Sequence, residues 1–350
     1  MGITASLRAM SSVDAMSLVD LERLIEFVAR VAPLAGEVDV QLLSGGQSNL
    51  TYLLTSGGYE YVARRRPIGE VPAGAHDMKR EYRVLAALMG TTLPVPRVHG
   101  FCDDDRPLGA PFYVMDRVRG SVLHRADDVA HLTEQEARDI SIEAIDVLTS
   151  LHQLDYVAIG LADLGRPEGF VARRVDRWLQ QWDRALHRDH PLVAPLATSL
   201  AGRAHLLRGG SALVHGDYRL GNMIVDPGPP GRVAALLDWE LSTLGDPLTD
   251  LAHLLVYWES SRGRLTHESQ LIALHPGFLS GAQLAERYAE TTGSNIAELD
   301  LYLAFEHWRA AIIKEGIYMR RRSVGDGTPG TDELGESVQL HLEEAADLLR

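Results

Sequence analysis

The sequence predicts an α+β protein, with a small β-sheet region over about residues 1–118 and a mainly helical region over about residues 119–350. Two observations support this division. Short apolar runs separated by glycine-rich or polar turns dominate the first region, and longer runs with helical spacing dominate the second. At 350 residues the chain also exceeds the usual size of one hydrophobic core, so one large or two unequal domains are expected.

The first region reads as a helix, a three-stranded β-meander, a second helix and two more strands. The helices are expected over 17–31, with Ser17 placed to cap the start, and over 75–89, because apolar residues recur on one face of each. The turns 44–49 and 56–58 are rich in glycine and serine, as hairpin turns are. The expected strands are 38–43, 50–55, 59–64, 95–101 and 112–118.

The second region is mainly helical. Its clearest helix, 133–155, opens with Thr133 and, three residues later, Glu136, the pattern of a capping box. Short β-like stretches at 212–214, 223–225 and 233–237 interrupt the helical pattern. The other expected helices are 170–187, 281–291, 299–320 and 334–349.

The charge of the chain argues against a nucleic-acid partner. The net charge is −14, and the first 118 residues carry 12 basic and 14 acidic side chains, so most of the excess lies in the second region. A binder of phosphate backbones needs the opposite field. Cys102 is the only cysteine and no apolar run is long enough to span a membrane, which favours a cytoplasmic protein with no membrane partner. The sequence does not indicate an oligomeric state.

The segment 213–251 holds the residues most typical of catalysis. An apolar strand leads into His215-Gly216-Asp217, Asn222 follows five residues after Asp217, and Asp238 comes directly after the next apolar run. Phosphoryl transfer needs phosphates held by a metal and cations, and an acceptor group aligned behind the phosphorus. A carboxylate can orient the acceptor and take its proton, and one amide with one carboxylate suffices for Mg²⁺, which keeps some of its waters.

This pattern resembles the aminoglycoside phosphotransferase and choline kinase family, whose members are related to the protein kinases. The resemblance rests on His-Gly-Asp-x4-Asn followed by an apolar strand and Asp, and it extends from about residue 42 to about residue 320. The stretch LLDWELSTLGDPLTDLA is most similar to the kinase-like domains linked to certain acyl-CoA dehydrogenases. The resemblance implies a protein-kinase-like fold with two lobes and the nucleotide in the cleft between them.

The resemblance also implies roles for individual residues. Asp217 is expected to be the catalytic base, Arg219 to support it electrostatically, and Asn222 and Asp238 to bind Mg²⁺. Asp246 or Asp250 is expected to brace the catalytic loop.

His215 is expected to shape the same loop rather than to take part in chemistry. The fourteen histidines show no spacing typical of metal ligands, so we interpret them as structural or exposed.

The first region would then supply the contacts to ATP or another nucleoside triphosphate. Arg64 stands where the family usually has a lysine that grips phosphates, and Glu81 is its natural partner. The backbone from Met115 to Arg117 is expected to meet the base. The turn expected to cover the phosphates contains Ser44, Gly45, Gly46, Ser48 and Asn49.

Several alternatives remain open at this point. Arg64, Arg65 and Arg66 could form a solvated edge with Glu81 as a surface charge. The leading hypothesis is a kinase for a small-molecule acceptor, either a polycationic aminoglycoside or a hydroxyacyl thioester. The second is a nucleotide-binding regulator with weak activity, because Arg64 replaces the lysine. The third is a hydrolase whose metal would be held by His215, Asp217 and Asp238.

Overall fold

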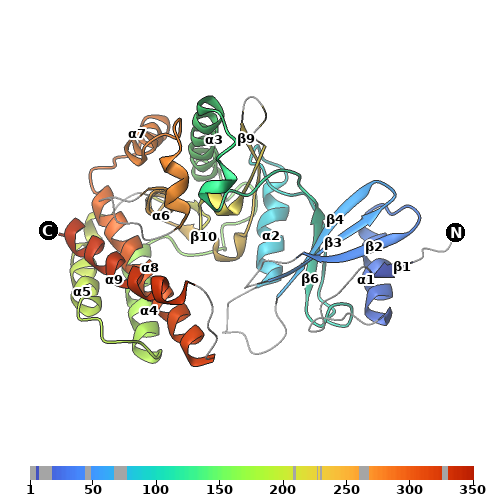
Figure 1. Ribbon diagram of the computed structural model, residues 1–350, viewed down its shortest axis with the longest axis horizontal. Helices are drawn as coiled ribbons and strands as arrows, with labels where there is room; N and C mark the ends of the chain where they lie inside the picture. Colours follow the sequence, from blue (N-terminus) through green and yellow to red (C-terminus); the bar gives the residue numbers. More distant parts are fainter. Residues whose placement is uncertain are drawn as a thin grey trace. The chain divides into compact units, whose positions relative to one another are not determined.

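The structure is a computed structural model that describes residues 5–7, 18–43, 49–66, 77–207, 210–226, 228, 231–259, 268–324 and 330–350 (Figure 1). The chain divides into two compact units. The N-terminal unit contains Met1–Arg119 and a second segment, Ala234–Glu240, and the C-terminal unit contains Gly120–Val233 and Leu241–Arg350. The segment that carries Asp238 therefore folds with the N-terminal unit, although the sequence analysis had assigned it to the helical region.

The N-terminal unit is built on a six-stranded sheet with the order β1-β2-β3-β4-β6-β5. The β1 strand pairs parallel to β2, and all other neighbours are antiparallel. Gly57 and Gly58 join β3 to β4 and both have positive φ, +53° and +93°, as a two-residue type I′ hairpin turn requires. The elements of this unit are β1 (Ala5–Leu7), α1 (Leu18–Val31), β2 (Val38–Leu43), β3 (Leu50–Ser56), β4 (Tyr59–Arg65), α2 (Met78–Leu88), β5 (Val98–Cys102) and β6 (Phe112–Asp116).

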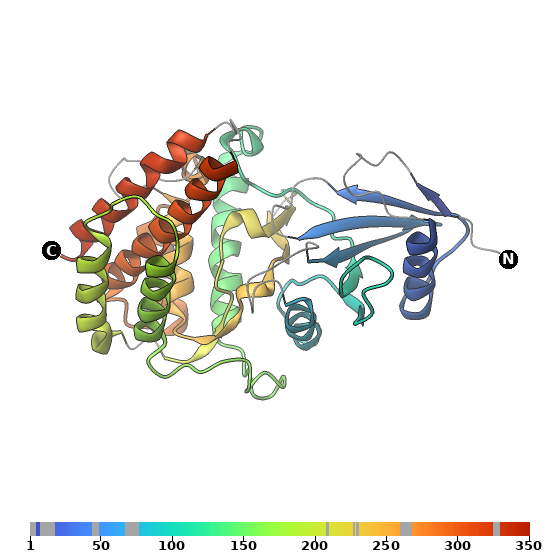
Figure 2. The same cartoon turned by 90° about the horizontal axis from the view of Figure 1, so that it is seen from below.

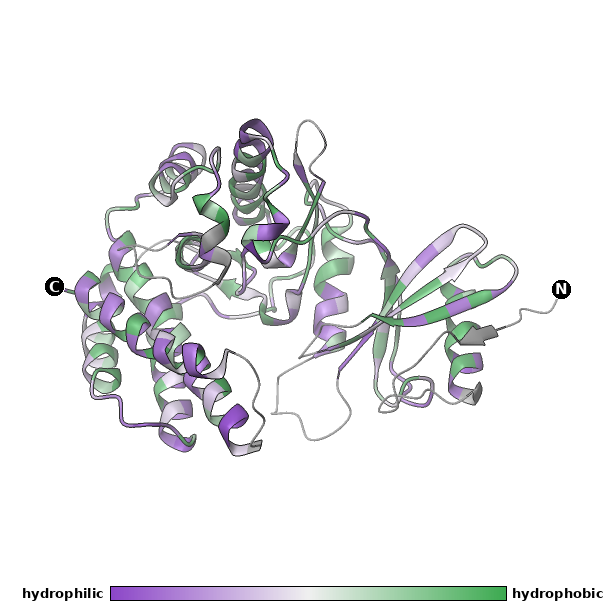
Figure 3. Cartoon of the chain, viewed as in Figure 1, coloured by the Kyte–Doolittle hydropathy of each residue, from purple (hydrophilic) through white to green (hydrophobic). Residues whose placement is uncertain are grey.

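Successive side chains of a strand point to opposite faces, so the two faces of this sheet carry different residues. On one face, Ala63 and Phe112 join a hydrophobic core to which α1 contributes five buried side chains, Leu21, Leu24, Ile25, Phe27 and Val28. On the other face, Arg64 of β4 lies opposite Tyr113 of β6. The ring of Tyr113 is 6.4 Å from that of Tyr82 on α2, and α2 carries both hydrophobic and hydrophilic residues along its length (Figure 3). Arg64 therefore projects on the face of the sheet that α2 packs against.

The C-terminal unit is mainly helical. The predicted capping box is present, since the Glu136 amide donates to Thr133 Oγ1 at 3.2 Å and the Thr133 amide donates to Glu136 Oε2 at 2.8 Å. The α8 and α9 helices lie side by side, next to α4 and α5 (Figures 1 and 2). The helices are α3 (Glu134–His152), α4 (Phe170–Arg184), α5 (Val193–Arg203), α6 (Leu248–Trp258), α7 (Gly281–Thr292), α8 (Leu299–Val324) and α9 (Thr331–Leu348).

Short strands position the loop that carries the predicted catalytic residues. The β7 strand (Ala212–Val214) pairs antiparallel with β10 (Thr243–Gly245), and β8 (Met223–Asp226) follows the loop. The β9 strand (Arg232–Leu236) then leads the chain into the second segment of the N-terminal unit. The fold class predicted from the sequence, a protein-kinase-like α+β fold with a small sheet-containing N-lobe and a mainly helical C-lobe, is confirmed.

Two helices were missing from the prediction. The α6 helix is buried along nearly its whole length, so its sequence lacks the apolar stripe that reveals a half-exposed helix. The α5 helix carries Pro195 near its start, within a short segment where the apolar spacing is weak. Among the described residues, no helix is both long enough and apolar enough to cross a membrane.

Candidate active site

The loop after β7 is held in place by a buried carboxylate of α6. Asp250, 1% exposed, accepts hydrogen bonds from the backbone amides of His215 at 2.5 Å and Gly216 at 2.8 Å. Gly216 has a φ of +85°, and a Cβ at this position would lie 2.7 Å from the carbonyl oxygen of Leu241, so only glycine fits. Of the two carboxylates proposed to brace this loop, Asp250 makes these contacts.

His215 is fully buried within the same loop. Its Nδ1 accepts a hydrogen bond from the Asp217 amide at 3.2 Å. Its ring therefore contacts the backbone of the loop, a geometry that suits the expected role in shaping it.

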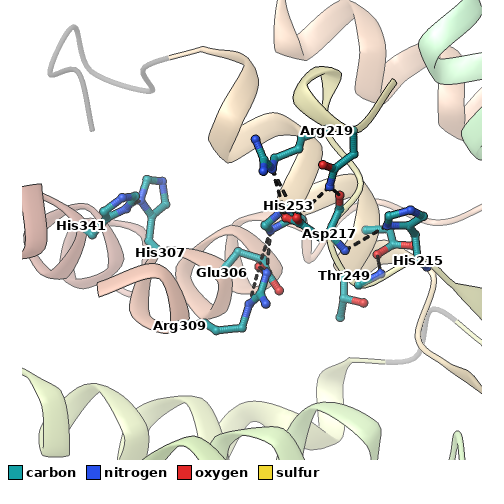
Figure 4. Close-up of polar contacts among 12 residues, drawn as sticks. His215, Asp217, Arg219, Thr249, His253, Glu306, His307, Arg309 and His341 are labelled. Carbon is teal, nitrogen blue, oxygen red and sulfur yellow. Dashed lines mark hydrogen bonds and ion pairs between the residues drawn. The ribbon is translucent and has the colours of Figure 1, made fainter. Parts of the chain in front are cut away.

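Asp217 lies at the centre of a set of donors (Figure 4). His253 Nε2 is 2.8 Å from Asp217 Oδ1, Asn222 Nδ2 donates to Oδ2 at 2.7 Å, and Arg219 Nε donates to Oδ1 at 3.2 Å. Burial opposes the charge of this carboxylate, but the hydrogen bond from His253 and the charge of Arg219 outweigh it, so the pKa of Asp217 is well below its ordinary value. Asp217 is therefore ionised at neutral pH.

Asn222 ends a single 3₁₀ turn, Leu220–Asn222, that follows the loop. Its amide nitrogen also donates to the carbonyl oxygen of Asp217 at 2.8 Å. Because the nitrogen of the amide is directed at Asp217, the amide oxygen is the atom that can bind a cation. This orientation fits a magnesium ligand, since Mg²⁺ prefers hard oxygen donors.

In the N-terminal unit, Arg64, Glu81 and Asp238 form a second charged cluster. The Arg64 guanidinium donates to Asp238 Oδ1 at 2.5 Å, and its Nε is 3.6 Å from Glu81 Oε2. Asp238 has a φ of +67°, and no other non-glycine residue of the described ranges has a positive φ. Its backbone is held in a rarely populated conformation, which is a feature of functional sites. The carboxylate oxygens of Asp238 are, like the amide oxygen of Asn222, suitable ligands for a divalent cation.

Glu81 is fully buried on α2. Burial raises the pKa of Glu81 to about 7 against the opposing charge of Arg64, and the charges of Asp238 and Glu240 add to the rise. Arg65 is 3% exposed and donates to the hydroxyl of Tyr52 at 3.1 Å. The alternative of a solvated arginine edge with Glu81 as a surface charge is therefore wrong for Arg64, Arg65 and Glu81.

The remaining predicted nucleotide contacts are only partly described. Ser44, Gly45, Gly46 and Ser48 lie outside the described residues, while Asn49 is 5% exposed and its amide nitrogen donates to Glu240 Oε2 at 3.1 Å.

Met115 is buried in β6, with Val62 and Val98 as its neighbours in the sheet. The Arg117 amide donates to the carbonyl of Glu60 at 3.1 Å. A base contact at Met115 to Arg117 stays a prediction, and the amides of Asp116 and Arg117 already donate to the carbonyls of Arg97 and Glu60.

The sequence analysis missed His253 of α6, which contacts Asp217, and the two residues of α8 that contact His253. His253 is 4% exposed and also contacts Glu306 and Arg309 of α8, so its interpretation as merely structural or exposed was incomplete. Its position three residues after Asp250, on an apolar helix, was the available signal. Within the described ranges, no group of three or more His, Cys, Asp or Glu side chains is arranged to hold a metal ion.

Comparison with known proteins places this geometry in a family. Residues 39–309 match the family model described as "Phosphotransferase enzyme family". The "Acyl-CoA dehydrogenase family member 11" of Gallus gallus is 34% identical over 322 residues, covering 90% of this chain and 41% of that protein. The "Probable acyl-CoA dehydrogenase IBR3" of Arabidopsis thaliana is 33% identical over 315 residues, covering 85% of this chain and 38% of that protein. The chain thus spans about two fifths of these relatives.

Solved structures share the fold over most of the chain. A Ralstonia eutropha protein described as a candidate aminoglycoside phosphotransferase is 32% identical, with a TM-score of 0.80 over 94% of this chain and 98% of that one. The aminoglycoside phosphotransferase APH(4)-Ia, solved with ADP and hygromycin B, is 18% identical, with a TM-score of 0.64 over 97% of this chain and 98% of that one, a likeness of fold alone. The family model and the identity to these relatives lead to one conclusion: the chain belongs to the phosphotransferase enzyme family.

Proposed function

We propose that the chain transfers the γ-phosphate of ATP, with Mg²⁺, to a hydroxyl group of a small molecule. The observation that carries the proposal is Asp217, an ionised carboxylate in a loop braced by Asp250 and hydrogen-bonded to Asn222. A carboxylate in such a setting can orient an acceptor hydroxyl and receive its proton. A weakly basic carboxylate is sufficient, because in most descriptions phosphoryl transfer has a loose transition state that needs positioning more than proton abstraction.

In this mechanism the acceptor oxygen forms a bond to the γ-phosphorus while the bond from that phosphorus to the β–γ bridging oxygen breaks. The proton of the hydroxyl passes to the Asp217 carboxylate, and ADP leaves. Arg219, 3.2 Å from Asp217, would stabilise negative charge nearby. Asn222 and Asp238 would hold the Mg²⁺, which when bound neutralises charge on the phosphates.

Arg64 would replace the usual lysine as the phosphate clamp. A guanidinium can bind phosphate oxygens through two parallel hydrogen bonds, so the substitution is compatible with nucleotide binding. Arg64 contacts Asp238 at 2.5 Å. This contact would have to break for Arg64 to bind the phosphates and for Asp238 to bind the metal. This contact is also the observation that favours the second candidate function, a nucleotide-binding regulator with weak turnover.

The acceptor is the part of the function to be found by experiment. The solved relatives include complexes with hygromycin B and with kanamycin, while the sequence relatives carry the name of acyl-CoA dehydrogenases. A screen should therefore measure ATP consumption with aminoglycosides, choline-like amines and hydroxyacyl thioesters, and identify the product by mass spectrometry. D217N serves as the control that must abolish every genuine signal.

The result expected for the leading proposal is a phosphorylated product with one acceptor class and none with D217N. Magnesium-dependent ATP binding without a product in any class would favour the regulator. Hydrolysis of phosphoesters without nucleotide, unaffected by N222A, would favour a metal hydrolase and contradict the proposal.

A further inference from the structure

His253 of α6 is placed to control the orientation of the Asp217 carboxylate. Its Nε2 lies 2.8 Å from Asp217 Oδ1, and the side chain is buried at 5% exposure (Figure 4). Both oxygens of Asp217 already accept hydrogen bonds from nitrogen donors, of Arg219 and of Asn222, so Asp217 is the acceptor of this contact and Nε2 carries the proton. The imidazole is therefore a donor to Asp217 whether the ring as a whole is neutral or charged.

Two residues of α8 hold the other side of the same ring. Glu306 Oε2 is 3.0 Å from His253 Nδ1, and Arg309 Nη2 is 2.6 Å from the same nitrogen. Arg309 Nε also donates to Glu306 Oε2 at 2.8 Å, so the two groups on α8 are fixed by each other. Either partner at Nδ1 is compatible with a proton on Nε2, because Arg309 donates to a neutral ring and Glu306 accepts from a charged one.

This arrangement leaves Asp217 with donors on both oxygens. His253 binds Oδ1, whereas Asn222 binds Oδ2 and also the backbone carbonyl of the same residue. If Asn222 turns its oxygen to a cation, its nitrogen keeps the second oxygen of the carboxylate in place. Arg219 also donates to Oδ1, at 3.2 Å, but its side chain is 24% exposed, whereas His253 is buried and held by α8. His253 is therefore the donor that limits the rotation of the carboxylate plane, and with it the direction of the lone pairs that remain for an acceptor hydroxyl.

A purely structural role would not require this geometry. A buried charged group is weak evidence for stability, since apolar residues of similar volume often stabilise a fold as well or better. Here Glu306 and Arg309, 3% and 4% exposed, already form an ion pair with each other, and His253 extends from that pair to the one carboxylate placed for catalysis. Orientation of the Asp217 carboxylate is therefore the one effect to which His253, Glu306 and Arg309 all contribute.

We propose that His253, held by Glu306 and Arg309, is a positioning residue that fixes the Asp217 carboxylate for phosphoryl transfer. The inference rests on the proposed function, because it assigns Asp217 the role of the base. The contacts of Glu306 and Arg309 with His253, and of His253 with Asp217, join α8 and α6 to the catalytic loop.

The test replaces His253 by glutamine or by asparagine, whose amide nitrogens lie at different distances from the backbone. The amide nitrogen of glutamine can reach the position of His253 Nε2, whereas that of asparagine reaches the position of Nδ1. We expect H253N and H253A to lower kcat by about 100-fold, the effect of misplacing a reacting group by about 1 Å. We expect H253Q to keep kcat within about tenfold of the wild type, with the Kd for ATP and magnesium unchanged in all three variants.

Two controls make the outcome decisive. H131N, at an exposed histidine, should leave kcat and Kd unchanged. Nitrogen-15 NMR of the imidazoles should show a slowly exchanging proton on His253 Nε2 in the wild type, and faster exchange in D217A, whether or not turnover occurs.

Equal losses in H253Q and H253N, or a loss confined to KM, would overturn the positioning role while leaving the proposed function intact. A wild-type protein that binds ATP with magnesium and shows the NMR signature, but phosphorylates no acceptor, would overturn the proposed function and this role together.

Discussion

At the scale of single residues, the account depends most on Asp217. D217N keeps the size of the side chain and a group that can contact Asn222, but it removes the charge and the ability to take a proton. We expect kcat to fall by about 1,000-fold or more, toward the upper end of what one general base contributes. The Kd for ATP with magnesium, measured by calorimetry, should change by less than about threefold. A variant that keeps wild-type turnover would show that Asp217 is not the base.

Arg64 gives a second prediction at this scale. R64A removes the phosphate clamp and leaves Glu81 buried without its ion-pair partner, so ATP affinity should fall by about 10- to 100-fold, the equivalent of roughly 1.4 to 2.7 kcal/mol. R64K restores a cation at the same place and should recover most of the affinity. Equal ATP affinity in the wild type and R64A would contradict the role of Arg64.

The sequence predicted the residues of the catalytic loop better than their surroundings. Asp217 and Asn222 are five residues apart, so one local segment reveals both. His253 is brought to Asp217 from 36 residues away, and the packing of α8 on α6 brings Glu306 and Arg309 to His253. The spacing of the fourteen histidines relative to one another does not distinguish one that contacts a carboxylate from one that fills space, and only the position of His253 three residues after Asp250 indicated a role.

At the scale of elements, the interface of α8 with α9 contains a buried lysine. Lys314 of α8 is 7% exposed and its ammonium donates to Ser337 Oγ at 3.3 Å. Burial lowers the pKa of Lys314 to about 8 from an ordinary value of 10.5. Between these two pH values the unfolded chain binds more protons than the folded one, so this group makes the free energy of unfolding rise with pH.

The prediction that follows concerns K314M. The penalty for burying the charge is fully present below pH 8, so at pH 7 the variant should be more stable than the wild type by up to about 3 kcal/mol. The gain should vanish as the pH approaches 10.5. Urea unfolding between pH 7 and 10 measures it, with K79M as the control at the other lysine, which is exposed. A gain independent of pH would contradict the shifted pKa.

Helix prediction succeeded where one face of a helix is exposed and failed where none is. The capping box at Thr133 marks the start of α3 because its signal is local. The α6 helix, which supplies both Asp250 and His253, gave no amphipathic signal because almost all of it is buried. The element most closely connected to the catalytic loop was therefore the hardest to predict.

At the scale of the whole molecule, the two units each carry part of the proposed machinery. The N-terminal unit holds Arg64, Glu81 and Asp238, and the C-terminal unit holds Asp217 and Asn222. We predicted a nucleotide clamp over 1–118 and an acceptor region over 119–350. The roles of the two regions in binding nucleotide and acceptor stay predictions. The inclusion of Ala234–Glu240 in the N-terminal unit could not be predicted, because it depends on contacts between segments far apart in the sequence.

The central proposal is that Asn222 and Asp238 each bind the magnesium ion that accompanies the nucleotide. The most direct test is a double-mutant cycle in which the affinity for a non-hydrolysable ATP analogue is measured with and without magnesium in wild type, N222A, D238A and the double variant. We predict that each single change removes most of the magnesium-dependent affinity and that the double variant is hardly weaker than either. Effects that simply add, or a magnesium dependence that survives both substitutions, would contradict the account.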